Sequence, residues 1–225
     1  HGFRASSDFD KGKIENVCDP FKMSASLLRL DKDDAAMIRL MKILVDKGVS
    51  VTTTPAVFAP ITGYEVILGG GEESLHPDVL RNVRAGYDRQ VGKDSNAVKL
   101  FAKELYWIKK FYDMGGKLVI GTDPTGAGRT VAGYGNRWSL EILLKAGFTI
   151  PQAVMLCTLR GAEYLNRAKE TGSVEKGKAA DLVLMEGDLT RDTGAVRKMQ
   201  MVFKDGIGYD PVKIFESVKG KVGLY

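Results

Sequence analysis

The sequence predicts an α/β protein with a parallel sheet covered by helices and a small β-rich segment after it. Two helical patterns, at 31–48 and 98–116, each lead directly into a short β-branched or apolar run. Repeated helix-to-strand units with almost no linker are typical of parallel sheets that carry helices outside them. Beyond residue 165 the pattern changes to short strands separated by glycine turns, which predicts the β-rich segment.

The first helix-to-strand unit follows residues 1–24, which carry few periodic signals and are predicted to form a loop. Asp31 is positioned to cap a helix that Gly48 ends. Residues 49–57 are rich in β-branched side chains and are predicted to form a strand whose end is marked by Pro55. The apolar face of the helix consists of four residues at helical spacing: Met37, Leu40, Met41 and Leu44.

The second unit follows a long loop-like segment, 58–97, which includes three consecutive glycines and a short helical piece near 77–84. So long an excursion after a strand is more often a functional loop than a structural one. Apolar residues then form one face of a helix that ends at Gly115 and Gly116, and a strand over 117–123 follows at once.

The strand at 117–123 carries the main chemical signal. Its apolar residues 118–120 suit a fully buried strand, and Gly121, Thr122 and Asp123 follow them. A carboxylate therefore stands at the carboxyl end of a strand, where barrels of parallel strands do their chemistry. The glycine-rich loop that follows can bring its backbone close to a ligand. An Asp before a Pro is also a common turn former or helix cap, so G-T-D-P by itself leaves both interpretations open.

The elements after this loop are two helices and then the short strands. A helix over 136–146 is closed by Gly147, and Thr149 with Gln152 predicts a capping box for the next helix. Cys157, in that helix, is expected to pack as a small apolar group. The triplet at 204–206, Lys-Asp-Gly, is a hairpin signal.

Composition is that of an ordinary globular protein and excludes several classes of function. The net charge is +5, but Lys and Arg are spread through the helices beside Asp and Glu, so we expect no nucleic-acid partner. The two cysteines, Cys18 and Cys157, lack metal-ligand spacing. No apolar run approaches the length of a membrane span, so none is expected.

Five motifs, taken together, resemble the carboxyl half of the amidohydrolase superfamily, above all its imidazolonepropionase-like and prolidase-like members. Their order and spacing carry the resemblance, because one such motif alone would be weak evidence. The motifs are G-T-D-P-T-G at 121–126, A-G-F-T-I-P-Q-A-V at 146–154, T-L-R-G-A-E-Y-L at 158–165, G-S-V-E-K-G-K-A-A-D-L-V-L at 172–184 and K-D-G at 204–206.

The resemblance implies a distorted (β/α)8 barrel of the TIM type that holds one or two divalent metals, with a small β-sandwich assembled from the two chain ends. On this mapping residues 1–166 are the carboxyl half of the barrel and 167–225 contribute to the sandwich. The run 49–57 is then the seventh strand and 117–123 the eighth. The opening His-Gly falls at the end of the sixth strand, where the family often has a metal-binding His.

The resemblance also implies roles for residues of the site. His1 and Asp123 match metal ligands, and Asp123 matches the general base that takes a proton from metal-activated water and passes it to a leaving amine. Zinc is the favoured metal because the family's ligands are His and carboxylate. His1 can alternatively be a frayed end. Thr53, Thr54, Thr125, Arg129 and Tyr134 could line a substrate pocket, although turn and loop chemistry explains each of them equally well.

The chain departs from the family pattern because the first-strand His-x-His pair, the fourth-strand carboxylate or carboxylated Lys and the fifth-strand His are missing. His76 begins a predicted helix and is assigned a surface or capping role. A full barrel needs about 250 residues. We therefore expect a partial copy whose amino-terminal half is on another polypeptide, cleaved away or absent, and a homo-oligomer of the complete protein.

Two functions remain open at this stage. The first is a metal-dependent hydrolase of amide or other C–N bonds in a small-molecule substrate, such as a cyclic amide or a dipeptide. The second is a non-catalytic binding or scaffolding protein that keeps the barrel architecture without a full ligand set. The missing histidines favour the second, and the Gly-Thr-Asp at a strand end favours the first.

Overall fold

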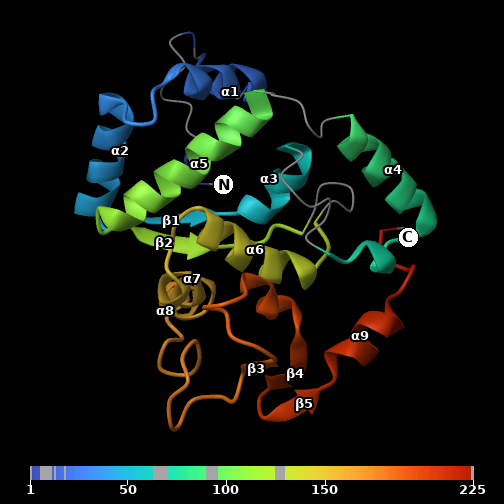
Figure 1. Cartoon of the computed structure of the whole chain (residues 1–225). Coiled ribbons are helices and arrows are strands. Elements are labelled where there is room, and N and C mark those ends of the chain that lie inside the picture. The colour runs from blue at the N-terminus through green and yellow to red at the C-terminus, as the bar shows by residue number, and fades with distance from the viewer. Residues whose placement is uncertain are drawn as a thin grey trace.

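The computed structural model describes residues 2–5, 12, 14–17, 19–62, 70–89, 96–124 and 130–223. A long helix, α5 (Asn96–Asp113), crosses a small parallel sheet, and other helices surround both of them (Figure 1). The β-rich part follows at the opposite side of the molecule. The predicted α/β class is confirmed.

The parallel sheet consists of β1 (Ser50–Thr53) and β2 (Lys117–Ile120), which pair in register from Ser50–Lys117 to Thr53–Ile120. The helix α2 (Ala35–Asp46) leads into β1, as α5 leads into β2. The backbone N–H of Gly121 donates to the Thr53 carbonyl at 2.9 Å and extends the pairing by one residue. Both predicted helix-to-strand units are therefore present.

The boundaries of both strands differ from the sequence prediction. The run predicted at 49–57 forms a strand only to Thr53, and Pro55 begins the helix α3 (Pro55–Thr62) instead of ending a strand. Proline suits the first turn of a helix, because the N–H that it lacks would have no partner there. The strand predicted at 117–123 ends at Ile120, so Asp123 lies just beyond it.

The two faces of the parallel sheet have different environments. Leu118 is 1% exposed and belongs to the main core with Ile108 and Phe111 of α5. On the other face Thr52 is exposed and Val119, its register partner, is partly exposed. The prediction that 118–120 would be fully buried is thus wrong for Val119 and Ile120, which are both partly exposed. In the described part of the chain, the face that carries Val119 is only partly covered.

The main core is built around α5. Its fully buried members include Trp107, Phe111, Leu27, Met37 and Leu143, which come from helices far apart in the sequence. The Trp107 indole N–H donates to the Lys32 carbonyl at 2.9 Å, so the ring is both packed and hydrogen-bonded. Trp138 is likewise buried and belongs to the same core.

The amino-terminal segment is more ordered than the predicted loop. It contains the short 3₁₀ turn η1 (Gly2–Ala5) and the helix α1 (Pro20–Arg29). Phe3 is buried, and its ring meets Phe111 edge-on at 5.5 Å between centroids. The Lys103 Nζ donates to the Leu28 carbonyl at 2.6 Å at the end of α1. Contacts with α5 hold this segment, and its own sequence periodicity does not show them.

Helix caps follow the local sequence closely. Asp34, rather than Asp31, caps α2 through the N–H groups of Ala36 and Met37. His76 caps the helix α4 (Pro77–Asp88), which confirms its capping role. The predicted capping box of Thr149 and Gln152 is present at the start of α7.

Three helices follow β2 in sequence: α6 (Tyr134–Lys145), α7 (Ile150–Cys157) and α8 (Leu159–Tyr164). α6 packs on α3 and α7, and both α7 and α8 contact β2. Cys157 is exposed, so the expectation that it packs as an apolar group is wrong. It lies at the last position of α7, while Ala153 and Leu156 on the same helix are buried.

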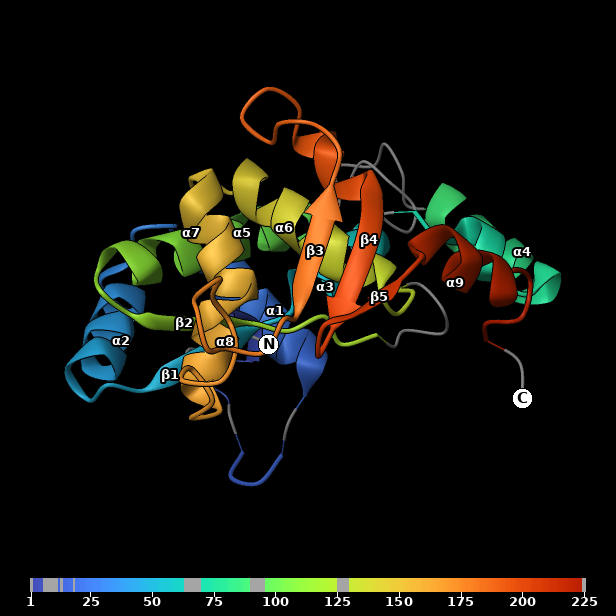
Figure 2. The ribbon, with the colours of Figure 1, turned by 90° about the horizontal axis from the view of Figure 1, so that it is seen from below.

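The β-rich part is an antiparallel sheet of β3 (Leu182–Met185), β4 (Met199–Lys204) and β5 (Ile207–Tyr209) in that order (Figure 2). The predicted hairpin turn is confirmed: Asp205 and Gly206 connect β4 to β5 with φ values of 51° and 81°. Two positive φ angles in a two-residue loop match the strand twist of a hairpin.

Two short elements flank the antiparallel sheet. The 3₁₀ turn η3 (Thr193–Arg197) packs on α6, and the helix α9 (Pro211–Ser217) packs on β4. Arg197 reaches Glu141 of α6 through two hydrogen bonds, of 2.6 and 2.7 Å. The β-rich part is therefore joined to the helical part by a specific ion pair.

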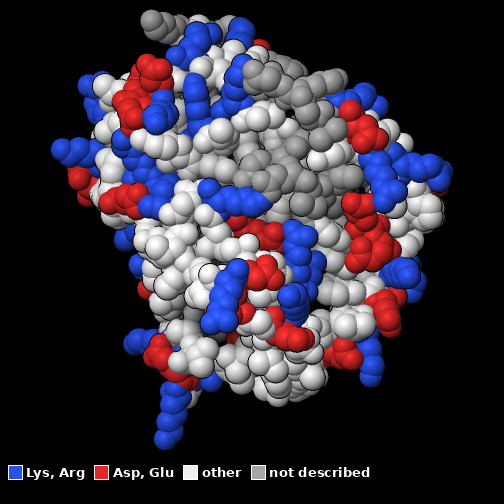
Figure 3. All heavy atoms as spheres, in the orientation of Figure 1, with Lys and Arg blue, Asp and Glu red and all other residues white. Residues whose placement is uncertain are grey.

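Acidic and basic side chains alternate over the face of the molecule seen in Figure 3. Among the described side chains on that face, basic groups lie beside acidic ones. Within the described segments, every helix is too short or too polar to cross a bilayer.

Candidate active site at the strand ends

The candidate site lies where β1 and β2 end side by side. Thr53 and Ile120 are register partners, and each strand is followed by polar residues: Thr54 after β1, and Thr122 and Asp123 after β2. The carboxyl ends of adjacent parallel strands meet at one edge of a sheet, which is why such edges collect the functional groups of barrels. Thr54 and the Gly-Thr-Asp segment therefore lie near one another at this edge.

Asp123 has an unusual backbone conformation for a residue with a side chain. Its φ is +49°, in the left-handed region, and its side chain is partly buried. Asp tolerates this region better than most residues do, but the conformation is uncommon outside turns and functional sites. The turn interpretation of G-T-D-P and the functional one therefore both fit the backbone, and the two are not exclusive.

A third chain segment reaches the same edge of the sheet. A Cβ placed on Gly2 would lie 3.1 Å from the Thr53 Oγ1 and 3.6 Å from Ile108, so η1 sits directly against the end of β1. Phe3 is buried, and its ring packs against Phe111 of α5, which also holds this segment. The residue before Gly2 is His1, which lies outside the described residues. The described structure thus brings the sequence neighbour of His1 to the end of β1.

Thr53 and Thr54 point to opposite sides of β1, because successive residues of a strand alternate. Thr53 faces Gly2 and α5, and it is 4% exposed. Thr54 approaches Gly121, where an added Cβ would come within 3.2 Å of its methyl group. Only Thr54 therefore shares the face of Gly121, and Thr53 packs inward, toward the helices.

Of the remaining predicted substrate residues, Thr125 and Arg129 lie outside the described residues. Tyr134 is the first residue of α6, and its ring is buried in a second cluster with Leu75, Val83 and Val131. Its hydroxyl donates to the Glu73 Oε1 at 2.8 Å. Burial raises the pKa of this phenol. The Tyr134 hydroxyl thus binds Glu73 and does not point to the strand ends.

A residue that the sequence did not single out, Arg137, lies beside Tyr134. Its guanidinium carbon is 4.4 Å from the centre of the Tyr134 ring and 5.6 Å from that of Phe215. Its Nε is buried, and no hydrogen bond reaches it in the described part of the chain. Burial lowers the pKa of the guanidinium. The three-residue spacing of Tyr134 and Arg137 in a helix was the only sequence signal for this contact.

Across the segments that the structure describes, no three His, Cys, Asp or Glu side chains come together as a metal site would require. Asp123 is the one described residue among the predicted ligands. A catalytic metal generally needs three protein ligands or more. The described residues therefore fit a metal only as part of a larger ligand set.

A parallel sheet with helices outside it, whose strands end in polar residues at one edge, defines a protein of the α/β class. The chain belongs to the amidohydrolase family, whose model matches residues 31–219. Members of this superfamily are typically metal-dependent. The resemblance inferred from the five motifs is confirmed.

Two curated relatives are imidazolonepropionases. The protein of Clostridium tetani (strain Massachusetts / E88) is 34% identical over 101 residues, which cover 42% of this chain and 23% of the relative. The protein of Geobacillus sp. (strain WCH70) is 29% identical over 161 residues, which cover 64% of this chain and 36% of the relative. The matches thus span about a third of these relatives, or less.

Solved structures with a similar fold include, by their titles, a prolidase and a Xaa-Pro dipeptidase. A prolidase complexed with N-methylphosphonate-L-proline has a TM-score of 0.52 at 16% identity, over 83% of this chain and 43% of the other. A Xaa-Pro dipeptidase with bound methionine in its active site has a TM-score of 0.51 at 20% identity, over 84% and 42%. At these identities the similarity shows the fold alone, that of amidohydrolase barrels.

Proposed function

We propose that this chain is the carboxyl-terminal half of a metal-dependent hydrolase that cleaves amide or other C–N bonds in small molecules. The observation that carries the proposal is Asp123, a carboxylate at the end of a parallel strand in a chain of the amidohydrolase family. The remaining strands of the barrel, and a second layer for the β-rich part as a sandwich, would come from an amino-terminal half.

The partly covered face of the parallel sheet supports this architecture. Thr52 and Val119 lie on the face that a closed barrel would turn toward its interior. The interior of a small barrel is filled by side chains from all its strands. Two strands cannot fill it, so further strands are needed to cover this face.

Asp123 would hold the metal together with His1 and with ligands from the amino-terminal half. When bound, a divalent metal would lower the pKa of a water molecule toward neutrality, so that the water could act as the nucleophile. Zinc is favoured for a ligand set of His and carboxylate, with one or two ions. The carboxylate of Asp123 is a suitable ligand for such an ion. The described residues alone supply too few ligands to bind one.

In the proposed reaction Asp123 accepts one proton and then releases it. Its carboxylate takes a proton from the attacking water and gives it to the departing nitrogen, so that the amine leaves neutral. The fixed position of β2 and the left-handed turn at Asp123 would orient the carboxylate toward the strand ends. Thr54 lies on the face of Gly121 and is placed to contact the substrate beside it.

The substrate class that we propose is a cyclic amide or a dipeptide. The curated relatives are named imidazolonepropionases, and two similar structures are a prolidase and a Xaa-Pro dipeptidase. Enzymes with these names cleave a C–N bond next to a carbonyl or imine-like carbon of their substrates. The segment after β1 would select among these substrates, because specificity commonly resides in the loops that follow barrel strands.

A second candidate function is a non-catalytic scaffold that keeps the barrel architecture. The lack of a three-ligand cluster among the described residues favours it. The retained Asp123, with its left-handed backbone, opposes it, because a scaffold has no need of a carboxylate held there.

Chelation separates the two functions. The complete protein should hydrolyse at least one member of a panel of cyclic amides and dipeptides, lose this activity after treatment with a chelator, and recover it with zinc. The physical reason is that the nucleophile depends on the metal for its lowered pKa. Chromatography would measure the release of the ring-opened product or of the free amino acids. Hydrolysis that survives chelation, or no hydrolysis of any member, would contradict the proposal.

A further inference from the structure

A hollow with a volume of about 360 Å³ lies on the side of α6 that faces the β-rich part. Its walls come from segments far apart in sequence: Gly70 and Gly71, the start of α6, the start of β4 and the helix α9. None of the strand-end residues Thr54, Gly121 or Asp123 lines it. A volume of this size is within the range of small-molecule sites in proteins.

The chemistry of the hollow is set by Arg137 on an aromatic support. The guanidinium lies over the rings of Tyr134 and Phe215, and its Nε lacks a hydrogen-bond partner in the described part of the chain. Stacking on an aromatic face leaves the N–H groups at the edge of the guanidinium for a partner in its plane. A buried donor without a partner costs free energy, which a ligand can recover.

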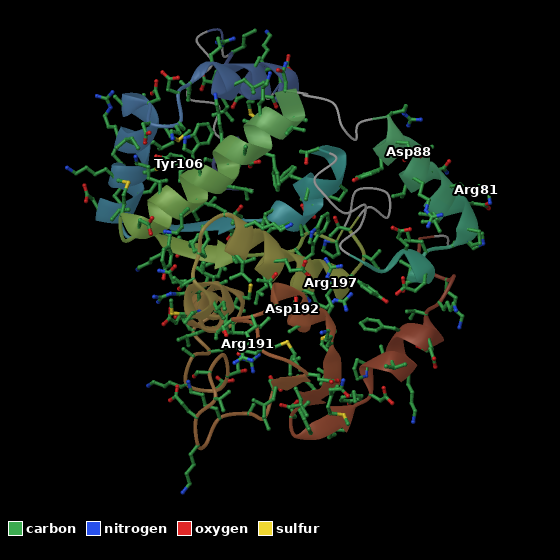
Figure 4. All side chains as sticks on the ribbon, in the orientation of Figure 1. Arg81, Asp88, Tyr106, Arg191, Asp192 and Arg197 are labelled. Atoms are coloured by element: carbon green, nitrogen blue, oxygen red, sulfur yellow. The ribbon has the colours of Figure 1, made fainter. Side chains whose placement is uncertain are left out.

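The other charged groups nearby are already paired or lie at the rim. Arg197 forms its two hydrogen bonds with Glu141 and lies beside α6 (Figure 4). Glu73 accepts a hydrogen bond from the Tyr134 hydroxyl. Glu216 and Lys219 are exposed and of opposite sign. In the described part of the chain, Arg137 is therefore the partly buried lining cation without a carboxylate partner, whereas Lys219 is exposed at the rim.

The remaining wall is apolar and is formed by Met199, Pro211 and Val212. Gly71, with φ of +97°, lets the backbone approach the Tyr134 ring, since an added Cβ would lie 2.7 Å from it. The backbone of Gly71 therefore packs directly against the Tyr134 ring. A ligand that fits would have an acidic group at Arg137 and an apolar body against these three residues.

We propose that this hollow, which we call the Arg137 pocket, binds a small carboxylate with an apolar body, at a site separate from the strand ends. A carboxylate matches the planar edge of a guanidinium and accepts two of its N–H groups at once. The pocket is formed by residues of this chain alone, so it does not depend on the hydrolase proposed above.

The test uses the full chain, benzoate as the probe and benzyl alcohol as its neutral match. Ligand-observed NMR measures both affinities and tolerates an associated protein. Benzoate should bind saturably at millimolar concentration or below, and benzyl alcohol about tenfold more weakly, because it lacks the carboxylate. This comparison needs no variant. Equal binding of the two probes, or no binding of benzoate, would overturn the proposal.

Variants assign the binding to Arg137. Arg137→Met should weaken benzoate binding by about tenfold or more, and Arg137→Lys should lie between it and the natural protein, because an ammonium keeps the charge without the planar fork. The matched control is Arg191→Met, which removes the same charge from an exposed side chain in the segment after β3 (Figure 4). It should change the affinity by less than about twofold.

A last pair of variants separates this pocket from the strand-end site. Asp123→Asn should leave benzoate binding unchanged, and Arg137→Met should leave turnover on the hydrolase substrate unchanged. Inorganic phosphate should compete with benzoate only weakly, because it cannot use the apolar wall. Benzoate binding that is weakened by Asp123→Asn and not by Arg137→Met would contradict the proposal.

Discussion

Replacing Asp123 with Asn should lower the turnover of the complete protein by about 100-fold or more while the fold survives. The amide keeps the shape of the carboxylate but cannot accept and pass on a proton, and general-base losses are commonly of this size. Asn also tolerates the left-handed conformation at φ +49°, so the turn itself should be preserved. The measurement is steady-state turnover on the substrate identified by the hydrolysis panel, with circular dichroism to check the fold.

The matched control for this variant is Asp205→Asn. Asp205 also has a left-handed backbone, with φ of +51°, but it lies in the hairpin between β4 and β5 and contacts Lys204 on the surface. Its substitution should leave turnover within about twofold, because exposed ion pairs contribute little. If Asp123→Asn left turnover at the level of this control, Asp123 would be a turn residue and the proposed mechanism would be wrong.

Expressed by themselves, the 225 residues should associate or aggregate and show no metal-dependent hydrolysis. The β-rich part contributes to this, because Leu184 is 56% and Ile207 61% exposed, in a sheet of only three short strands. Apolar strands exposed in this way are sites of association. The partly covered face of β1 and β2 adds a second such surface.

Co-expression with the polypeptide that supplies the amino-terminal strands should give a soluble assembly and restore hydrolysis. Size-exclusion chromatography measures the first effect and turnover the second. A control surface variant, Leu184→Lys, should reduce association of the isolated chain, because a charge on an exposed strand opposes pairing, without creating activity. A soluble, cooperatively unfolding and active monomer of these residues alone would overturn the barrel mapping.

Local signals in the sequence predicted much of the fold. The capping box of Thr149 and Gln152, the hairpin at Asp205 and Gly206 and the two helix-to-strand units each depend on residues close together in the chain. Pro55 was misassigned because the β-branched run continues through it, and the same residue also suits a helix start. The sequence alone could not choose between an end and a beginning at that position.

The candidate site could be predicted only in part. Asp123 could be proposed from the sequence because an apolar run and a polar end are adjacent there. The place of Gly2 against Thr53 and the commitment of Tyr134 to Glu73 depend on contacts between distant segments, which no spacing reveals. Arg137 was missed for the same reason, since Phe215 and Gly70 reach it from other parts of the chain.

Metal content tests the central claim, that this chain supplies part of a shared metal site, most directly. Elemental analysis should compare the isolated chain, the complete assembly and the assembly carrying Asp123→Asn, all purified without chelators. We predict one or two equivalents of a divalent metal, zinc foremost, in the assembly, a reduced content in the variant and none in the isolated chain, because Asp123 and His1 are too few ligands to bind an ion alone. An assembly without stoichiometric metal, or an isolated chain that holds a full equivalent, would contradict the account.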